Sequence, residues 1–106
     1  MSAEKKYGKN EGTGKMKLSV LMPAYNEVHT LMDIISRLEK VDIEKELVIV
    51  DDCSTDGTRE LLKKNFGDGK LGVKVIYHEK NMGKGKAIRS AIENAAGDFC
   101  VIQDAD

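Results

Sequence analysis

Apolar residues concentrate in four short runs, and between the runs they recur at spacings of three and four positions. The runs cover residues 17–22, 46–51, 73–78 and 99–102. Short apolar runs bounded by turn residues are typical of strands in a parallel sheet that is covered on both faces. The intervening periodic stretches predict helices. This alternation predicts an α/β fold, an open Rossmann-like parallel sheet with helices on both faces and right-handed crossovers.

The first helix is expected at residues 27–40, with Asn26 as its N-cap. Pro23 is expected to end the first strand, because proline cannot donate to a sheet ladder. The buried face of the helix is expected to comprise Leu31, Ile34, Ile35 and Leu38.

A polar turn at residues 51–57 is expected to lead into a short helix at residues 58–65, capped by Asp56 or Ser54. The glycine-rich residues 67–72 predict a loop. A third helix follows residues 81–86, and its small side chains would let it lie close to the sheet. Its sheet-facing stripe is expected to comprise Ala87, Ile88, Ala91, Ile92 and Ala95.

Composition narrows the classes of function. A chain of 106 residues suits one domain, and 17 basic against 18 acidic residues give no general attraction for nucleic acid or acidic membranes. Cys53 and Cys100 match no metal or redox spacing, which favours reduced thiols in the cytoplasm, with the cytoplasmic face of a membrane as an alternative. No apolar run approaches the roughly 20 residues of a membrane span. Residues 1–15 have few apolar side chains and predict a flexible tail before a domain at residues 16–106.

The last residues of the chain contain candidate metal ligands. In an extended backbone Asp104 and Asp106 point the same way across the small Ala105. Two carboxylates that face one point repel each other unless a cation lies there, and the hard ions Mg²⁺ and Mn²⁺ prefer such oxygen ligands together with substrate phosphates. The alternative is a pair of ordinary solvated acids, which a lone Asp-x-Asp more often is.

Three polar loops leave the carboxyl ends of predicted strands, where open α/β sheets bind ligands. Tyr25 could stack on a base, and Asp52 could accept a hydrogen bond from a base or a ribose. The alternative for the second loop is a turn that only caps a helix. The loops would gather on one rim Tyr25, Glu27, Asp52, Asp104 and Asp106.

Lys84 lies in a glycine-rich entry to a helix, where free amides and a cation favour phosphate. The segment lacks the third glycine of a dinucleotide fingerprint and the Ser or Thr of a P-loop, so a structural turn is the alternative. His29 and His78 have no partner at metal-ligand spacing, which favours solvated or hydrogen-bonded histidines.

Three segments carry a resemblance to a known family: LMPAYNE, LVIVDDCSTDGT and NMGKGKAIRSAIENAAGDFCVIQDAD. Together they resemble the amino-terminal half of the nucleotide-sugar domain of family 2 glycosyltransferases, most of all the dolichyl-phosphate or polyprenyl-phosphate mannosyl- and glucosyltransferases. The resemblance implies a GT-A fold and a DxD element, Asp104 to Asp106, that meets the metal and the diphosphate. It also implies a nucleotide pocket lined by Pro23, Tyr25, Glu27, Val50, Asp52, Asp104 and Ala105.

The resemblance further implies transfer of a hexose from a GDP- or UDP-sugar, with inversion, to a lipid phosphate. The expected chain is a fragment that ends at the DxD element and is inactive alone, so no catalytic residue is assigned. Its last strand, residues 99–102, would then expose unpaired amides and favour self-association. Two alternatives remain: a nucleotide-binding scaffold or sensor without transfer chemistry, and a dinucleotide-dependent oxidoreductase, which the missing glycine fingerprint disfavours.

Overall fold

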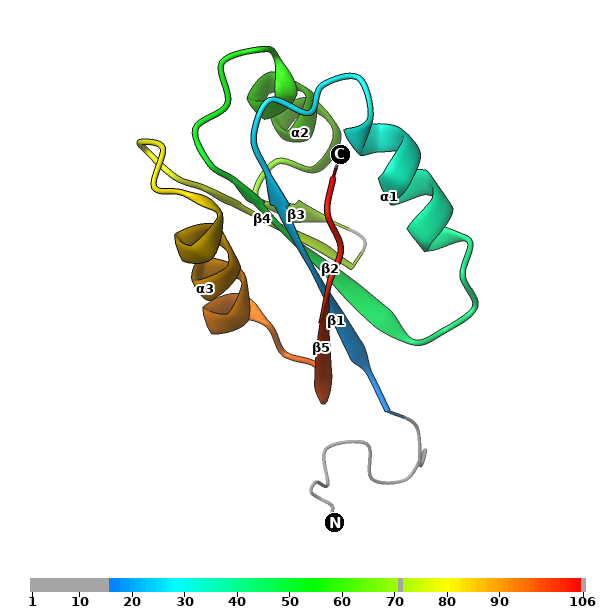
Figure 1. Cartoon of the computed structure of the whole chain (residues 1–106). Coiled ribbons are helices and arrows are strands. Elements are labelled where there is room, and N and C mark those ends of the chain that lie inside the picture. The colour runs from blue at the N-terminus through cyan, green and yellow to red at the C-terminus, as the bar shows by residue number, and fades with distance from the viewer. Residues whose placement is uncertain (1–15, 71, 106) are drawn as a thin grey trace.

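The computed structural model describes residues 16–70 and 72–105, and the tail predicted at residues 1–15 lies outside them. The described elements are β1 (Leu18–Ala24), α1 (Leu31–Glu39), β2 (Lys45–Asp51), α2 (Thr58–Phe66), β3 (Gly69–Lys70), β4 (Val73–Tyr77), α3 (Lys84–Asn94) and β5 (Phe99–Ile102). The strands form one sheet in the order β3-β4-β2-β1-β5, parallel except for the β3–β4 pair. The predicted α/β fold with helices on both faces is confirmed (Figure 1).

The direction in which strands are added reverses at β1. From β1 the chain proceeds outward to β2 and β4, and then β5 returns to the opposite side of β1. Helices α1 and α2 pack on one face of the sheet, and α3 packs on the other (Figure 1). In open α/β sheets such a reversal leaves a crevice at the carboxyl ends of the two strands that flank it.

Alternating side chains of β1 and β2 supply both halves of the core. Val20 and Met22 on β1, together with Ile49 on β2, face α1 and α2. Leu21 and Val48 belong to the other half, against α3. Both strands are almost completely buried, which explains why their sequences are nearly continuous in apolar residues.

Pro23 does not end β1, contrary to the prediction, and the strand continues to Ala24. In a parallel ladder the N–H and C=O of one residue point to the same neighbouring strand, and successive residues alternate. The Ala24 carbonyl accepts from the Asp52 amide (2.9 Å) on the β2 side, and the Leu21 carbonyl accepts from the Gln103 amide (2.9 Å) on the β5 side. The missing N–H of Pro23 therefore faces β5, and the β1–β2 ladder is intact.

Helix α1 begins at Leu31, later than predicted, because residues 28–30 form a turn. Asn26 does not cap it. Asn26 has a φ of 54°, a conformation that asparagine tolerates better than most residues, and its side-chain oxygen accepts a hydrogen bond from the Thr55 amide (2.8 Å). The four predicted apolar residues do pack toward the core, with Leu31 and Ile35 buried most completely.

Helix α3 meets the sheet through Ala87, Ser90 and Ala91. Ile92, which was predicted to lie in this stripe, is 52% exposed. At 3.6 residues per turn Ile92 lies about 140° around the helix from Ala87, outside the contact face.

The loop predicted at residues 67–72 contains the two-residue strand β3, which pairs antiparallel with β4.

The burial that the apolar pattern of residues 99–102 suggested is not observed, and the last strand is exposed at an edge, as expected for a strand with unpaired amides. β5 lies at the edge of the sheet, and its side chains are exposed, Phe99 by 58% and Ile102 by 51%. Helix α3 packs chiefly on β1 and β2, and so does not cover β5 to the same extent.

Within residues 16–70 and 72–105, no helix has both the length and the apolar character that crossing a bilayer requires.

A buried carboxylate anchors the turn between α3 and β5. Glu46 Oε2 accepts hydrogen bonds from the Ser19 hydroxyl (2.6 Å) and the Ala96 amide (2.5 Å), while Lys74 Nζ lies 3.1 Å from Oε1. The Gly97 amide donates to the Ser19 hydroxyl (2.8 Å). Burial alone would raise the pKa of Glu46, but these hydrogen bonds outweigh it and the pKa lies below its usual value.

Substitution of Gly97 by alanine is expected to destabilise the protein. An added Cβ would lie 2.6 Å from the Ser19 hydroxyl and 2.8 Å from the Lys17 carbonyl, so backbone would have to shift. We expect the free energy of unfolding to fall by roughly 1–3 kcal/mol, the range for overpacked sites, measured by chemical denaturation. Gly85→Ala is the control, because its Cβ meets nothing within 4 Å on helix α3 and should leave stability equal or higher. Equal stability of Gly97→Ala and wild type would contradict this packing.

Candidate functional site

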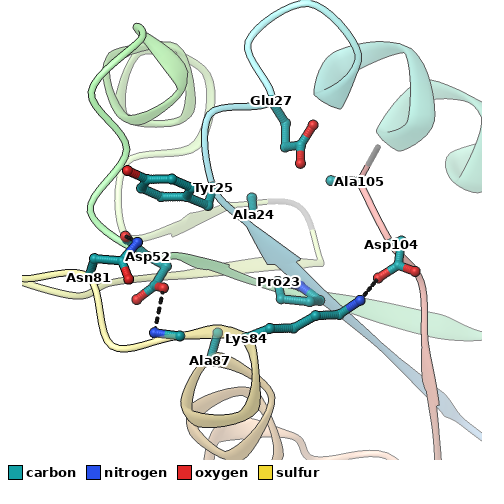
Figure 2. A pocket seen from close by; sticks show the side chains of 11 residues that line it. Pro23, Ala24, Tyr25, Glu27, Asp52, Asn81, Lys84, Ala87, Asp104 and Ala105 are labelled. Carbon is teal, nitrogen blue, oxygen red and sulfur yellow. Dashed lines mark hydrogen bonds and ion pairs between the residues drawn. The ribbon is translucent and has the colours of Figure 1, made fainter.

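A cavity of about 300 Å³ opens at the carboxyl end of the sheet, on the reversal between β1 and β5. Its walls come from the ends of β1 and β2, the entry to α3 and the segment after β5 (Figure 2). The residues that line it are Pro23, Ala24, Tyr25, Glu27, Asp52, Asn81, Gly83, Lys84, Ala87, Asp104 and Ala105. Segments that are distant in sequence thus build one concave site.

The loop after β1 is tied to the loop after β2 by hydrogen bonds between side chains and backbone amides. The Asn26 amide donates to the Ser54 hydroxyl (2.9 Å), and the Glu27 amide donates to the Thr58 hydroxyl (2.9 Å). The Val28 amide donates to Asp56 Oδ2 (3.2 Å). Asp56 also accepts from the Thr58 amide (2.9 Å) at the start of α2, but the N-cap position of α2 is occupied by Gly57 and not by Asp56 or Ser54 as predicted. These contacts fix the backbone that carries two cavity residues, Tyr25 and Glu27.

Asp52 is a buried charge of the site, only 3% exposed. Its Oδ1 accepts from the Met82 amide (2.9 Å) and lies 2.9 Å from His78 Nδ1, while Oδ2 accepts from the Gly83 amide (2.9 Å). Burial alone would raise the pKa of Asp52. The hydrogen bonds from His78, Met82 and Gly83 outweigh burial, so the pKa lies below its ordinary value of 3.8. Asp52 therefore carries a fixed negative charge at neutral pH.

Lys84 and Asp104 form an ion pair along the cavity. Lys84 Nζ lies 2.6 Å from Asp104 Oδ1, and the lysine side chain extends from the first turn of α3 past Pro23 (Figure 2). The side chains are 60% and 52% exposed, and an ion pair so exposed contributes little to stability. This pair can therefore open at small cost when a ligand competes for either partner.

The segment after β5 is held by Thr30, whose hydroxyl donates to the Ala105 carbonyl (2.7 Å). Ala105 itself is 2% exposed and packs in the core cluster below α1. Asp104 is thereby held at one end of the cavity, with Tyr25, Asp52 and Asn81 at the other (Figure 2).

The donor chemistry for a divalent ion is present only in part within the described residues. No group of three or more His, Cys, Asp or Glu side chains gathers there, and Asp106, the second predicted ligand, lies outside them. Asp104 offers a half-exposed carboxylate on the cavity wall. One such carboxylate fits an ion that takes its remaining ligands from substrate phosphates and water, which is common for Mg²⁺.

Comparison with known proteins assigns the family. The profile of glycosyl transferase family 2 matches residues 19–106. The chain is 39% identical over 95 residues to the poly(ribitol-phosphate) beta-N-acetylglucosaminyltransferase TarS of Staphylococcus aureus, and 39% identical over 93 residues to a dolichol-phosphate mannosyltransferase of Pyrococcus furiosus. The chain belongs to glycosyl transferase family 2. Both alignments cover 86% of this chain, but only 16% and 26% of the two relatives.

Solved structures of the family share the fold of this family 2 chain. TarS residues 1–349 of S. aureus, solved in complex with UDP-GlcNAc, match 86% of this chain and 27% of that one, with a TM-score of 0.75 and 39% identity. The mannosyltransferase PcManGT from Pyrobaculum calidifontis, solved with GDP-Man and Mn²⁺, matches 89% and 28%, with a TM-score of 0.77 and 29% identity. The predicted GT-A fold is confirmed.

The cavity of this family 2 chain contains most of the predicted pocket residues. Val50 is the exception: it is fully buried on β2, where it packs in the core cluster with α3, and it does not line the cavity. The described residues brought together as predicted are Pro23, Tyr25, Glu27, Asp52, Lys84, Asp104 and Ala105.

Sequence reasoning did not assign Asn81 and Gly83 to the site, although both line the cavity. It also left His78 without a specific partner. The available signal was position, because residues 78–83 leave the carboxyl end of β4 next to β2, where a fourth loop of the rim is expected.

Replacement of Asp52 by asparagine is expected to lower stability by about 1–3 kcal/mol at neutral pH, because an amide cannot satisfy two backbone donors and His78 together. The stabilisation by a carboxylate of lowered pKa is complete above the unfolded value of 3.8 and is lost as the pH falls through the folded pKa. The stability difference from wild type should thus be present above about pH 4 and shrink as the pH falls below it. Urea denaturation across this range measures it.

The matched control is Asp104→Asn, which removes a half-exposed carboxylate and should change stability little. A difference between Asp52→Asn and wild type that is as large at pH 3 as at pH 7 would contradict the assignment of a buried, ionised Asp52.

Proposed function

We propose that this chain is the nucleotide-sugar-binding part of a glycosyltransferase that transfers a hexose from a GDP- or UDP-sugar. One observation carries the proposal: Asp52, Lys84 and Asp104, from three separate segments, line a single cavity at the topological switch point. Family membership supports it, and so do two solved relatives, TarS in complex with UDP-GlcNAc and PcManGT in complex with GDP-Man.

The two ends of the cavity suit the two ends of a nucleotide sugar. At one end the aromatic ring of Tyr25, 45% exposed, can stack on a base, while the Asp52 carboxylate and the Asn81 amide offer hydrogen bonds. At the other end Lys84 provides a cation at the first turn of α3, where helix amides also favour phosphate. We assign the base to the Tyr25 end and the diphosphate to the Lys84 end.

A divalent ion fits the diphosphate end through the Asp104 carboxylate, with Asp106 as the second proposed ligand. When bound, Mg²⁺ or Mn²⁺ would neutralise the diphosphate and make it a better leaving group. Lys84 is placed to share that task, because its ammonium group already lies within the same cavity.

For the acceptor we propose a lipid phosphate of the polyprenyl or dolichyl type, with inversion at the sugar. A phosphate acceptor is already an anionic nucleophile, so the reaction needs no strong general base. The two curated relatives are named for different acceptors, poly(ribitol-phosphate) and dolichol-phosphate, which share a phosphate. The chain covers only 16% and 26% of the lengths of these two relatives.

Calorimetric titration tests the nucleotide specificity directly. We expect UDP or GDP to bind in the presence of Mn²⁺, and we expect EDTA to weaken binding at least tenfold, because the diphosphate would then lack its main counter-charge. NAD⁺ serves as the control for a dinucleotide site and should not compete. Binding of NAD⁺ but of neither nucleoside diphosphate would overturn the proposal.

Lys84→Met is expected to weaken UDP or GDP binding roughly tenfold, the loss typical of one charge-assisted hydrogen bond, and to leave nucleoside binding unchanged. Lys86→Met is the matched control, since Lys86 lies on the same helix and does not line the cavity. Both variants are titrated with the nucleoside and the diphosphate. Equal losses for the two ligands would place Lys84 away from the phosphates.

We also propose that copies of the chain associate through β5. Its outer edge has no partner strand among the described residues, and Phe99, Val101 and Ile102 are about half exposed. Light scattering at high concentration should detect a dimer or larger assembly, and Val101→Lys should reduce it by adding a charge to the edge. A monomer at high concentration would contradict this proposal and would leave the nucleotide site unaffected.

A further inference from the structure

His78 lies outside the cavity wall, yet both of its ring nitrogens make buried hydrogen bonds. Nδ1 lies 2.9 Å from Asp52 Oδ1, and Nε2 lies 2.8 Å from the Ser90 hydroxyl on α3. The three residues are nearly inaccessible, with exposures of 8% for His78, 3% for Asp52 and 7% for Ser90. Each ring nitrogen needs a partner when it is buried, and a ring held at both nitrogens is fixed in position and rotation.

The charge of Asp52 determines the direction of these hydrogen bonds. An ionised carboxylate only accepts, so the hydrogen between Nδ1 and Oδ1 belongs to His78. In the neutral ring Nε2 is then the acceptor, and the Ser90 hydroxyl donates to it. Helix α3 is in this way connected through His78 to the carboxylate on the cavity wall.

The Asp52 carboxylate has one hydrogen-bond acceptor position left for a ligand. A carboxylate has about four acceptor positions, and three donors already use Asp52, namely His78 Nδ1 and the amides of Met82 and Gly83. Asp52 also lines the cavity. The one further position, on Oδ2, is therefore the position that a ligand N–H or O–H would use.

We infer that His78 is a positioning residue of the nucleotide site, which acts through Asp52 and is itself positioned by Ser90. Through its hydrogen bond, His78 keeps the Asp52 carboxylate ionised and oriented, and Asp52 in turn holds the amides of residues 82 and 83. One acceptor position of the carboxylate is thereby presented to the base end of the cavity. This inference rests on the proposed function. His78 would not touch the nucleotide.

The other charges around His78 do not take over this role. Arg59 on α2 donates to the His78 carbonyl (2.9 Å) and pairs with Asp51 Oδ2 (3.0 Å), so its charge is used on the backbone side. The contact from α3 is the neutral Ser90 hydroxyl. Lys84 pairs with Asp104 elsewhere in the cavity. Among these groups only Asp52 contacts the ring as a charged partner.

Two amide variants separate the two ring nitrogens. His78→Asn places an amide nitrogen near the position of Nδ1 and can keep the bond to Asp52. His78→Gln places one near Nε2 and can keep only the bond to Ser90. We expect His78→Gln to bind UDP or GDP roughly tenfold more weakly, the loss typical of one hydrogen bond to a charged group, and His78→Asn to bind within about threefold of wild type. Ser90→Ala should fall between them.

The pH dependence of binding provides a second readout. Without the Nδ1 hydrogen bond the pKa of Asp52 should rise, so the acid loss of nucleotide affinity should move to higher pH in His78→Gln and not in His78→Asn. Protonation of the nucleotide phosphates affects all variants alike. His29→Gln, at an exposed histidine, is the control and should match wild type in both measurements. Thermal denaturation verifies that each variant is folded at each pH.

The outcomes distinguish this inference from the proposed function. If wild type binds no nucleoside diphosphate, the proposed function fails and takes this inference with it. If wild type binds and the two His78 variants lose affinity equally, with no displacement of the pH profile, His78 is only a packing residue and the inference fails. If one His78 variant does not fold, Ser90→Ala decides: unchanged affinity and an unchanged pH profile would overturn the inference.

Discussion

The cavity depends on one hydrogen bond that the chain cannot make. The Leu21 carbonyl accepts from the Gln103 amide, so the next bond of the β1–β5 ladder would run from the N–H of residue 23 to the carbonyl of residue 103. Pro23 has no N–H, and strand pairing between β1 and β5 ends there. On its other side β1 continues its register with β2 as far as Asp51. The two ladders around β1 thus differ in length, and the segment with Asp104 is released to form the far wall.

A second constraint is the placement of charge at the ends of the strands. Asp51, the last residue of β2, is fully buried and paired with Arg59, while its neighbour Asp52 turns toward the cavity and collects donors from the loop after β4. Two successive carboxylates therefore connect β2 to different elements. Asp51 joins β2 to α2, and Asp52 joins β2 to the entry of α3. Because each is satisfied by different donors, the mutual repulsion of adjacent acids does not open the turn.

The elements that the sequence predicted best are those whose apolar pattern is decided locally. β2 and the buried face of α1 follow directly from their residues. The exposure of β5 does not follow from its apolar pattern, because its residues suit a central strand and only the order of strands in the sheet reveals that it is an edge. Asn26 shows the same limit: a preferred capping residue lost that role because Thr55, distant in sequence, uses its side chain. The partnership of Asp52 with His78 likewise depends on β4 lying beside β2.

The two ends of the cavity differ in how firmly their charges are held, and the difference suits the chemistry of a nucleotide sugar. Asp52 is buried and held by three donors, so it would not reorganise when a base binds, and a preorganised partner discriminates between hydrogen-bond patterns more sharply than a mobile one. The side chains of Lys84 and Asp104 are more than half exposed, and they form an ion pair with each other. A diphosphate with its cation must enter and leave in every cycle, and a weak ion pair can exchange its partners at each step. For the function proposed above, specificity would belong to the rigid end of the cavity and turnover to the mobile end.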